Sequence, residues 1–313
     1  MGQDCSHPRS VPPPGATHNT ASLVSLDEVI GKVNAHLRKD LVLDSSRTEF
    51  AKLVATTLHS LLRGGLVGKN RYCQLLLGRK MVGKTTLLES LQAAAKTLDQ
   101  RLRVSMFVSG HHAAGSPVNL IRSAMGLPVR NDSRTPTERV ADLCEEMEER
   151  GLYAFVVFDE LQDVFLSSDP GAKQFIFELS SIGESKKGRI FCVLTGSSST
   201  LRQLCFAKLA PPLRPSYPAY TGIDMNSIKF QPFYIAPFLE PADFQRLVAH
   251  YSPAATEDEA FLSEVFVRTG GCPGLVSIYV ERPGSPPDPY TVSSKGIGSA
   301  GADDLESRSE HSM

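Results

Sequence analysis

The chain has 313 residues, 41% of them hydrophobic, which is enough for one large domain or two small ones with a full core. Its 33 Lys and Arg balance 34 Asp and Glu, and the net charge of −1 excludes a general electrostatic attraction to nucleic acid. We therefore expect no nucleic-acid site, and no apolar run approaches the roughly 20 residues that cross a bilayer.

The six cysteines show neither paired nor metal-type spacing, and several lie inside apolar runs. This usage favours a reducing, intracellular compartment, and we expect a cytoplasmic protein. The first six residues, MGQDCS, also fit a myristoylation signal with Gly2 as acceptor, and Cys5 beside it is suited to a second acyl chain. The pattern therefore predicts contact with a membrane surface, unless the chain begins with Met-Gly by chance.

Composition divides the chain into five parts. They are a disordered leader (1–20), N-terminal helices (21–66), a core of alternating strands and helices (67–238), a short helical lid (239–280) and a disordered tail (281–313). Capping boxes at Ser25 with Glu28 and at Ser46 with Glu49 open the two N-terminal helices. We interpret both helices as scaffolding packed against the core.

Apolar runs alternate with amphipathic helices through the core, which predicts a parallel sheet with helices on both faces. We expect its five strands at 73–77, 104–108, 153–158, 190–195 and near 230–235. Beyond Pro237, the spacing predicts two short helices around 244–251 and 261–266, followed by a brief apolar segment that ends at Val280.

The stretch from Leu75 to Leu91 reads LLLGRKMVGKTTLLESL and combines a strand, a glycine-bounded loop and a helix at the GxxxxGKT spacing. The two glycines let successive amide groups point inward around an anion, and the helix adds its positive N-terminal end. We expect Lys84 to reach the β- and γ-phosphates of ATP and the Thr85 hydroxyl to reach Mg²⁺. The predicted nucleotide-binding residues are Gly78, Arg79, Lys80, Met81, Val82, Gly83, Lys84, Thr85 and Thr86.

The third and fourth expected strands end in polar residues, where ligands of such sheets bind. Asp159 is placed to hold Mg²⁺, and Glu160 is placed to act as a general base on a water. After the fourth strand, a hydroxyl of Thr195 or Ser197 would bond the attacking water or the γ-phosphate, although simple turn formation explains these residues equally well. The predicted catalytic residues are Glu160, Lys84 and Ser197, and the predicted metal ligands are Thr85 and Asp159.

Five segments, GRKMVGKTT, FDELQDVF, VLTGSSS, IAPFLEPADFQRLV and TGGCPG, follow one another in the order found in archaeal-type AAA ATPases. Over about Phe50 to Val280 the chain resembles this family, which belongs to the AAA+/STAND branch of P-loop NTPases. The resemblance implies a three-layer α/β sandwich with strand order 5-1-4-3-2 and a short C-terminal helical lid. It also implies that Lys84 and Thr85 are Walker A contacts and that Asp159 and Glu160 form the Walker B pair.

The resemblance further implies that Ser197 or Ser198 is sensor 1 and that the turn at 270–273 lies near the adenine. The chain departs from the family in having a short lid and no assignable arginine finger. Four arginines remain open as fingers, although a surface role is favoured for each of them: Arg189, Arg202, Arg214 and Arg268.

The sequence thus predicts a Mg²⁺-dependent ATPase that drives conformational change in a protein partner or a homo-oligomer. The main alternative is a nucleotide-dependent switch that binds ATP tightly and turns it over slowly. An interaction protein with a decayed site and a small-molecule kinase are weaker alternatives.

Overall fold

The computed structural model describes residues 25–64, 73–108, 116–131, 133–161, 164, 170–185, 188–196, 231–255 and 258–281. The predicted disordered leader, the acylation signal at Gly2 and Cys5, Ser197 and the tail lie outside these residues. Within the described part, no helix is both long and apolar enough to cross a membrane.

The core alternates strands and helices. In chain order, its elements are α1 (Leu26–Asp40), α2 (Ser45–Leu62), β1 (Cys73–Leu77), α3 (Lys84–Ala95), β2 (Leu102–Val108), α5 (Pro117–Ala124), α6 (Pro136–Glu149), β3 (Tyr153–Asp159), α8 (Pro170–Glu184), β4 (Ile190–Thr195) and β5 (Gln231–Tyr234). The lid consists of α10 (Pro241–Tyr251), a short 3₁₀ helix (Pro253–Ala255), α11 (Glu259–Thr269) and α12 (Pro273–Glu281). The apolar segment expected before Val280 is therefore part of a further helix.

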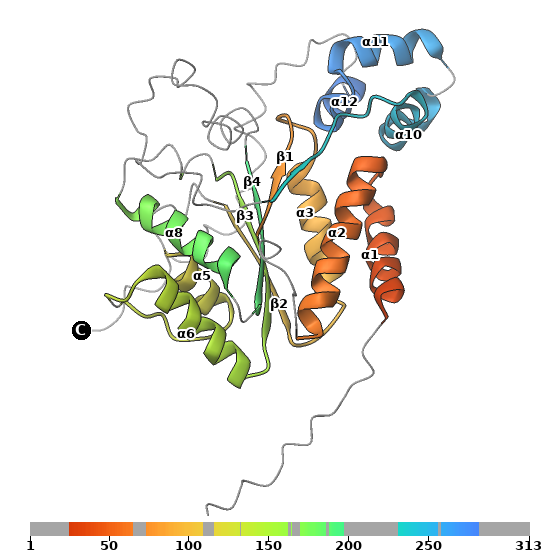
Figure 1. The fold of residues 1–313 in the computed structure, drawn as a ribbon. Helices are drawn as coiled ribbons and strands as arrows, with labels where there is room; N and C mark the ends of the chain where they lie inside the picture. The colour runs from red at the N-terminus through yellow and green to blue at the C-terminus, as the bar shows by residue number, and fades with distance from the viewer. Residues whose placement is uncertain are drawn as a thin grey trace, which may run out of the picture.

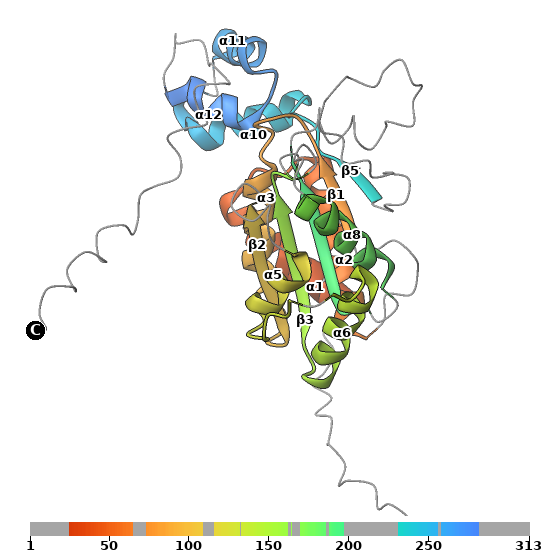
Figure 2. The same ribbon diagram turned by 90° about the vertical axis from the view of Figure 1, so that its left-hand side faces the viewer.

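The five strands form one parallel sheet in the order β2-β3-β4-β1-β5, which confirms the predicted order read from the other edge. β1 lies between β4 and β5, and β3 lies between β2 and β4 (Figures 1 and 2). Since all the strands run the same way, the ends of β1, β3 and β4 meet at one edge of the sheet. The loop after β1 and the end of β3, which carry predicted site residues, therefore meet at this edge.

Helices cover both faces of the sheet, as the nearly continuous apolar strands require. α1, α2 and α3 pack on one face, and α5, α6 and α8 cover the other (Figures 1 and 2). Alternate residues of β3 serve the two cores: Phe158 contacts Phe107 and Phe175, whereas Phe155 stacks on Phe191. The result is the predicted three-layer α/β sandwich.

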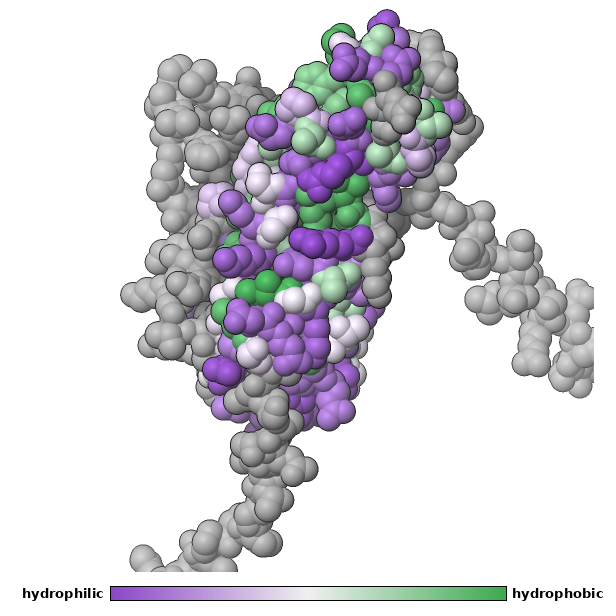
Figure 3. Space-filling view, turned by 90° about the vertical axis from the view of Figure 1, so that its right-hand side faces the viewer, coloured by the Kyte–Doolittle hydropathy of each residue, from purple (hydrophilic) through white to green (hydrophobic). Residues whose placement is uncertain are grey.

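The lid helices enclose a small core of their own and lie beside the loop that follows β1 (Figure 1). Its centre is formed by Phe238, Phe244, Leu247, Val265 and Val276. On the face formed by the N-terminal helices, mostly hydrophilic side chains surround small, separate hydrophobic patches (Figure 3).

Two of the helix starts test the predicted caps. Ser25 accepts a hydrogen bond from the backbone N–H of Glu28 at the start of α1, as expected. The predicted cap of α2 is wrong: Asp44, not Ser46, is the N-cap, because its carboxylate accepts both the N–H of Arg47 and the hydroxyl of Ser46. A charged carboxylate is the stronger acceptor for these donors.

Candidate functional site

The loop between β1 and α3 is tightly packed at its two glycines. A Cβ atom on Gly78 would lie 2.9 Å from both the carbonyl oxygen of Ile235 and a methyl group of Val82. Gly83 has a φ of 85°, a left-handed conformation that glycine adopts without strain. The loop is therefore held in a tight curl that begins at the end of β1 and leads directly into α3.

Met81 lies between these glycines and has a φ of 64°, which is uncommon for a residue with a side chain. Its carbonyl oxygen accepts the N–H of Gly274 at 3.0 Å, so the loop is bonded directly to the first turn of lid helix α12. A Cβ atom on Gly274 would lie 3.0 Å from the Met81 methyl carbon, which shows how closely the two segments approach.

The ammonium group of Lys84 folds back over the loop. It donates to the carbonyl oxygens of Gly78 at 3.0 Å and Arg79 at 3.1 Å. Burial lowers the pKa of Lys84, and the carboxylates of Asp159 and Glu160 oppose this shift. The ammonium group is thus held against the loop by two backbone carbonyl oxygens.

Two residues 74 positions apart meet at the edge of the sheet. The hydroxyl of Thr85, in the first turn of α3, donates to Asp159 Oδ2 at 2.7 Å. Asp159 ends β3 and is 3% exposed, and its Oδ1 accepts the N–H of Glu160 at 2.8 Å. The structure therefore brings together the residues predicted to be metal ligands.

Glu160 follows Asp159 with a φ of 55°, a second left-handed residue that is not glycine. Backbone strain of this kind costs of order 1 kcal/mol and is concentrated at functional sites. The side chain of Glu160 is half-buried, and its carboxylate is close enough to Lys84 to influence the pKa of the lysine. The role of Glu160 as a general base stays a prediction.

The hydroxyl of Thr195 bonds within the sheet and is not free at the end of the strands where Thr85 and Asp159 meet. Its side chain is fully buried, its hydroxyl donates to Leu76 O at 3.0 Å, and its carbonyl oxygen accepts the N–H of Leu161. Thr195 therefore ties β4 to β1 and fixes the turn that follows Glu160. Ser197, predicted to be catalytic, and Ser198 lie outside the described residues.

The remaining loop residues differ in exposure: Val82 is fully buried, whereas Arg79, Lys80 and Thr86 are exposed. Among the arginines considered as fingers, Arg189 precedes β4 at the opposite edge of the sheet. It lies over the ring of Tyr153 at 4.7 Å and pairs with Glu148. Arg189 is therefore a structural residue of that edge, and Arg202 and Arg214 lie outside the described residues.

Arg47 of α2 is the site residue that the sequence reasoning missed. Its guanidinium donates to Val82 O in the loop at 2.6 Å and to Ala236 O before the lid at 3.2 Å. We interpreted α2 as scaffolding, although one signal was present: Arg47 stands three residues before Phe50, within the apolar stripe of the helix. A charged residue in that stripe indicates a buried polar contact.

Among solved structures, the ORC2 protein of Aeropyrum pernix in ADPNP–ADP complexes is similar, with 18% identity over 66% of this chain and 51% of that one, and a TM-score of 0.45. Cdc6p of Pyrobaculum aerophilum shares 17% identity over 79% of this chain and 63% of that one, with a TM-score of 0.42. Drosophila ORC bound to DNA shares 12% identity over 80% of this chain and 62% of that one, with a TM-score of 0.49.

The chain thus spans 51–63% of the length of these three proteins. No model of a known protein family matches it, and no curated protein sequence does. Similarity at this level concerns the course of the chain and says nothing about activity. The strand order and the strand–loop–helix connection at β1 define a three-layer α/β fold of the P-loop NTPase type.

Proposed function

We propose that the chain binds Mg²⁺-ATP at the loop from Gly78 to Thr86 and hydrolyses it. The observation that carries this proposal is the 2.7 Å hydrogen bond between the Thr85 hydroxyl and the Asp159 carboxylate. It joins the start of the helix after the loop to the end of a neighbouring strand. A site for a metal-bound phosphate chain requires this juxtaposition of a hydroxyl and a carboxylate.

The donor set at this point fits Mg²⁺, which prefers oxygen ligands and binds through one or two protein groups plus phosphates and waters. Thr85 and Asp159 would hold the ion, and Asp159 is buried at the base of the site. When bound, Mg²⁺ would neutralise part of the negative charge on the β- and γ-phosphates.

The loop itself would hold the phosphates through its backbone N–H groups, aided by the N-terminus of α3. On ATP binding, the Lys84 ammonium would exchange its contacts with Gly78 O and Arg79 O for phosphate oxygens. Both partners would then be charged, which strengthens each hydrogen bond.

Glu160 would take a proton from the attacking water, and Ser197 would help to position that water or the γ-phosphate. The backbone of Glu160 is fixed from two sides: its N–H donates to Asp159, and the next residue, Leu161, bonds to Thr195 O. A carboxylate whose backbone is fixed in this way is suited to general-base catalysis, which contributes roughly 10²–10⁴-fold to the rate.

A second candidate function, a switch with slow turnover, is favoured by the position of Arg189. This residue lies over Tyr153 at the far edge of the sheet, so it does not reach the phosphates of its own chain. An arginine finger accelerates phosphoryl transfer by roughly 10³–10⁵-fold, so the intrinsic rate would be low if none of the other candidates, Arg202, Arg214 and Arg268, acts as one. A neighbouring subunit or a protein partner would then supply it.

In either case, the nucleotide state would be transmitted as a conformational change, because Met81 in the loop is bonded to Gly274 in the lid. We propose a homo-oligomer or a protein partner as the recipient of this change. A cytoplasmic location, with membrane contact through acylation at Gly2 and Cys5, remains part of the proposal.

Phosphate release measured across a range of protein concentrations tests the proposal. Hydrolysis in the parent that is abolished in Glu160→Gln supports the ATPase, and a rate per chain that rises with concentration indicates a site completed by a neighbour. Tight ATP retention with negligible release in both proteins supports the switch. Failure of the parent to bind ATP contradicts both functions.

A further inference from the structure

Arg47 is 3% exposed, and its guanidinium joins segments that are far apart in the sequence. One end pairs with Asp44 at 2.5 Å, within the first turn of its own helix. The donors reach Val82 O and Ala236 O, and the guanidinium carbon lies 4.2 Å from the centre of the Phe238 ring. One side chain therefore contacts the start of α2, the phosphate-binding loop and the segment that leads to the lid.

The contact with Val82 O fixes the peptide group that joins Val82 to Gly83. In a planar trans peptide, the carbonyl and the following N–H point in opposite directions, and no described peptide is cis. By holding Val82 O against α2, Arg47 turns the Gly83 N–H away from α2. The orientation of this N–H, immediately before Lys84, is one that an anion-binding loop depends on.

The other contacts of Arg47 are with residues 236–238, the segment that is bonded to the lid. The N–H of Phe238 donates to Gly271 O at 2.9 Å, and a Cβ atom on Gly271 would lie 2.1 Å from Phe238 O. The lid turn at Gly271 is therefore in close contact with Phe238, whose ring also contacts Arg47. On the other side, the bond between Gly274 and Met81 returns from the lid to the loop.

We infer that Arg47 is a positioning residue of the nucleotide site, which sets the loop peptide after Val82 and couples the loop to the lid. The role in nucleotide binding rests on the proposed function, whereas the coupling is a property of the free chain. Burial lowers the pKa of Arg47 and Asp44 opposes the shift. A lysine here would keep the charge but lack the planar fork that bonds two carbonyls and stacks on a ring.

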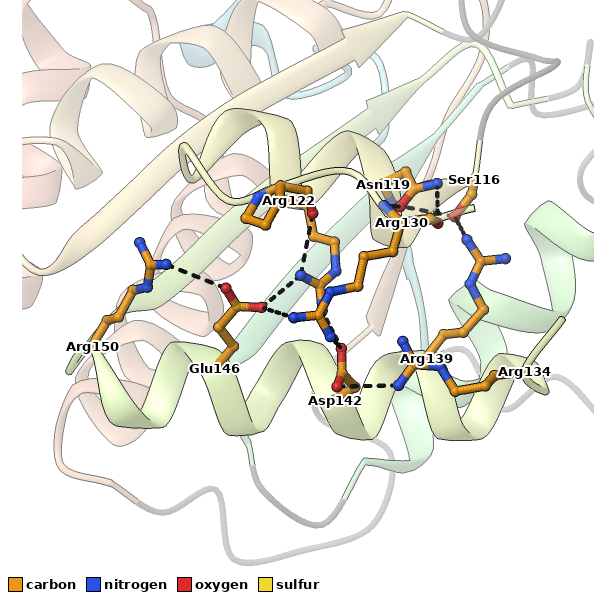
Figure 4. Close-up of polar contacts among 10 residues, drawn as sticks. Ser116, Asn119, Arg122, Arg130, Arg134, Arg139, Asp142, Glu146 and Arg150 are labelled. Atoms are coloured by element: carbon orange, nitrogen blue, oxygen red, sulfur yellow. Dashed lines mark hydrogen bonds and ion pairs between the residues drawn. The ribbon is translucent and has the colours of Figure 1, made fainter. Parts of the chain in front are cut away.

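A second buried arginine provides a matched control for a merely structural role. Arg122 in α5 is 1% exposed, and it pairs with Asp142 and Glu146 of α6 on the face away from the loop (Figure 4). It also donates to a backbone carbonyl, that of Pro128. Arg122→Lys therefore disturbs a buried ion pair of similar kind without touching the phosphate-binding loop.

The experiment compares Arg47→Lys and Arg122→Lys in the full chain. Mg²⁺-ATP affinity is measured by calorimetry, and hydrogen exchange at 80–84 and 271–276 is measured without nucleotide. We expect both variants to unfold at lower temperature, but only Arg47→Lys to weaken ATP binding, by at least about tenfold, and to accelerate exchange in both segments. We also expect kcat at saturating ATP to change less than KM, since Arg47 does not touch the reacting atoms.

Equal ATP affinity of Arg47→Lys and the parent would overturn the positioning role. Unchanged exchange at 271–276 would overturn the coupling, and this measurement decides even if the parent binds no ATP. If Arg47→Lys does not fold, Phe238→Leu removes the ring contact while the charge remains. We then expect faster exchange at 271–276 and weaker ATP binding, and unchanged values of both would overturn the inference.

Discussion

The clusters around Arg47 and Arg122 show two uses of a buried arginine in one fold. Arg122 bonds mainly to side chains, with Asp142 and Glu146 as its partners, and it fastens α5 to α6 (Figure 4). Arg47 has one carboxylate partner, Asp44, and directs its other donors to backbone carbonyls of a loop and a linker. The first cluster joins two helices, whereas the second sets the conformation of segments that have no regular structure of their own.

The two clusters also differ in how much charge surrounds them. Arg130 and Arg134 also pair with Asp142, and both are partly exposed. The cluster around Arg122, called the outer cluster below, therefore contains several alternative ion pairs. In the cluster around Arg47, called the inner cluster below, the side chains of Arg47 and Asp44 are both buried. A change in the inner cluster should therefore affect the nucleotide site, and a change in the outer cluster should affect stability.

The largest expected effect is on turnover, from a change at the edge of the sheet that leaves both clusters intact. Glu160→Gln should lower kcat by roughly 10²–10⁴-fold, because it removes the general base, and should leave ATP affinity within about threefold. Phosphate release and calorimetry measure the two quantities. Glu148→Gln, on an exposed carboxylate paired with Arg189, is the control and should keep full turnover. Equal loss in both variants would contradict the role of Glu160.

The next largest expected effect is a loss of stability from a change in the outer cluster alone. Arg122→Met should destabilise the fold by about 2 kcal/mol, because it removes the buried partner of two partly buried carboxylates, Asp142 and Glu146. Urea unfolding measures this loss, and ATP affinity of the folded protein should match that of the parent. If ATP affinity fell together with stability, the claim that the outer cluster affects only stability would be wrong.

A change in the loop isolates the site. Lys84→Ala should weaken ATP binding by roughly 10–100-fold, since hydrogen bonds to charged groups contribute about 1.5–3 kcal/mol. The free energy of unfolding without nucleotide should not decrease by a comparable amount, because the buried ammonium is partly desolvated and its pKa is lowered. Thermal unfolding with and without ATP measures both effects, and an unchanged response to ATP would contradict the assignment of Lys84.

The smallest expected effect is a pH dependence of the outer cluster. Burial alone raises the pKa of Asp142, but the attraction of Arg134, Arg130 and Arg122 outweighs it, so the pKa lies below its ordinary value. A depressed carboxylate pKa stabilises the fold above the unfolded value of about 4, and this contribution is lost as pH falls through the folded pKa. Asp142→Asn should therefore show a smaller loss of stability than the parent below about pH 4. Identical acid unfolding would remove Asp142 as a contributor.

The loop between β1 and α3, with its strand and helix, was predictable because the signal is local. Gly78, Gly83, Lys84 and Thr85 lie within eight positions, and each is required by the geometry of one turn. The partner strand that ends in Asp159 was predictable because an apolar run stops there. The sheet order followed from the family resemblance and not from the residues themselves.

The role of Arg47 could not be derived from spacing. Its partners are backbone carbonyls, which leave no mark in the sequence, and one of them, Ala236, is 189 positions away. The error at the start of α2 had a related cause: Ser46 fits a capping pattern, but Asp44 competes with it for the N-cap position. The Asp44 carboxylate accepts the N–H of Arg47, and the Ser46 hydroxyl itself donates to Asp44. Such competition is decided only when the donors and acceptors are placed in space.

Calorimetric titration of Mg²⁺-ATP into the parent and into Asp159→Asn tests the account most directly, because Asp159 with Thr85 unites the two halves of the site. We predict one ATP bound per parent chain, with tighter binding when Mg²⁺ is present. In Asp159→Asn, binding should persist but lose its dependence on Mg²⁺. A parent that binds no ATP, or a variant that keeps the full effect of Mg²⁺, would contradict the account.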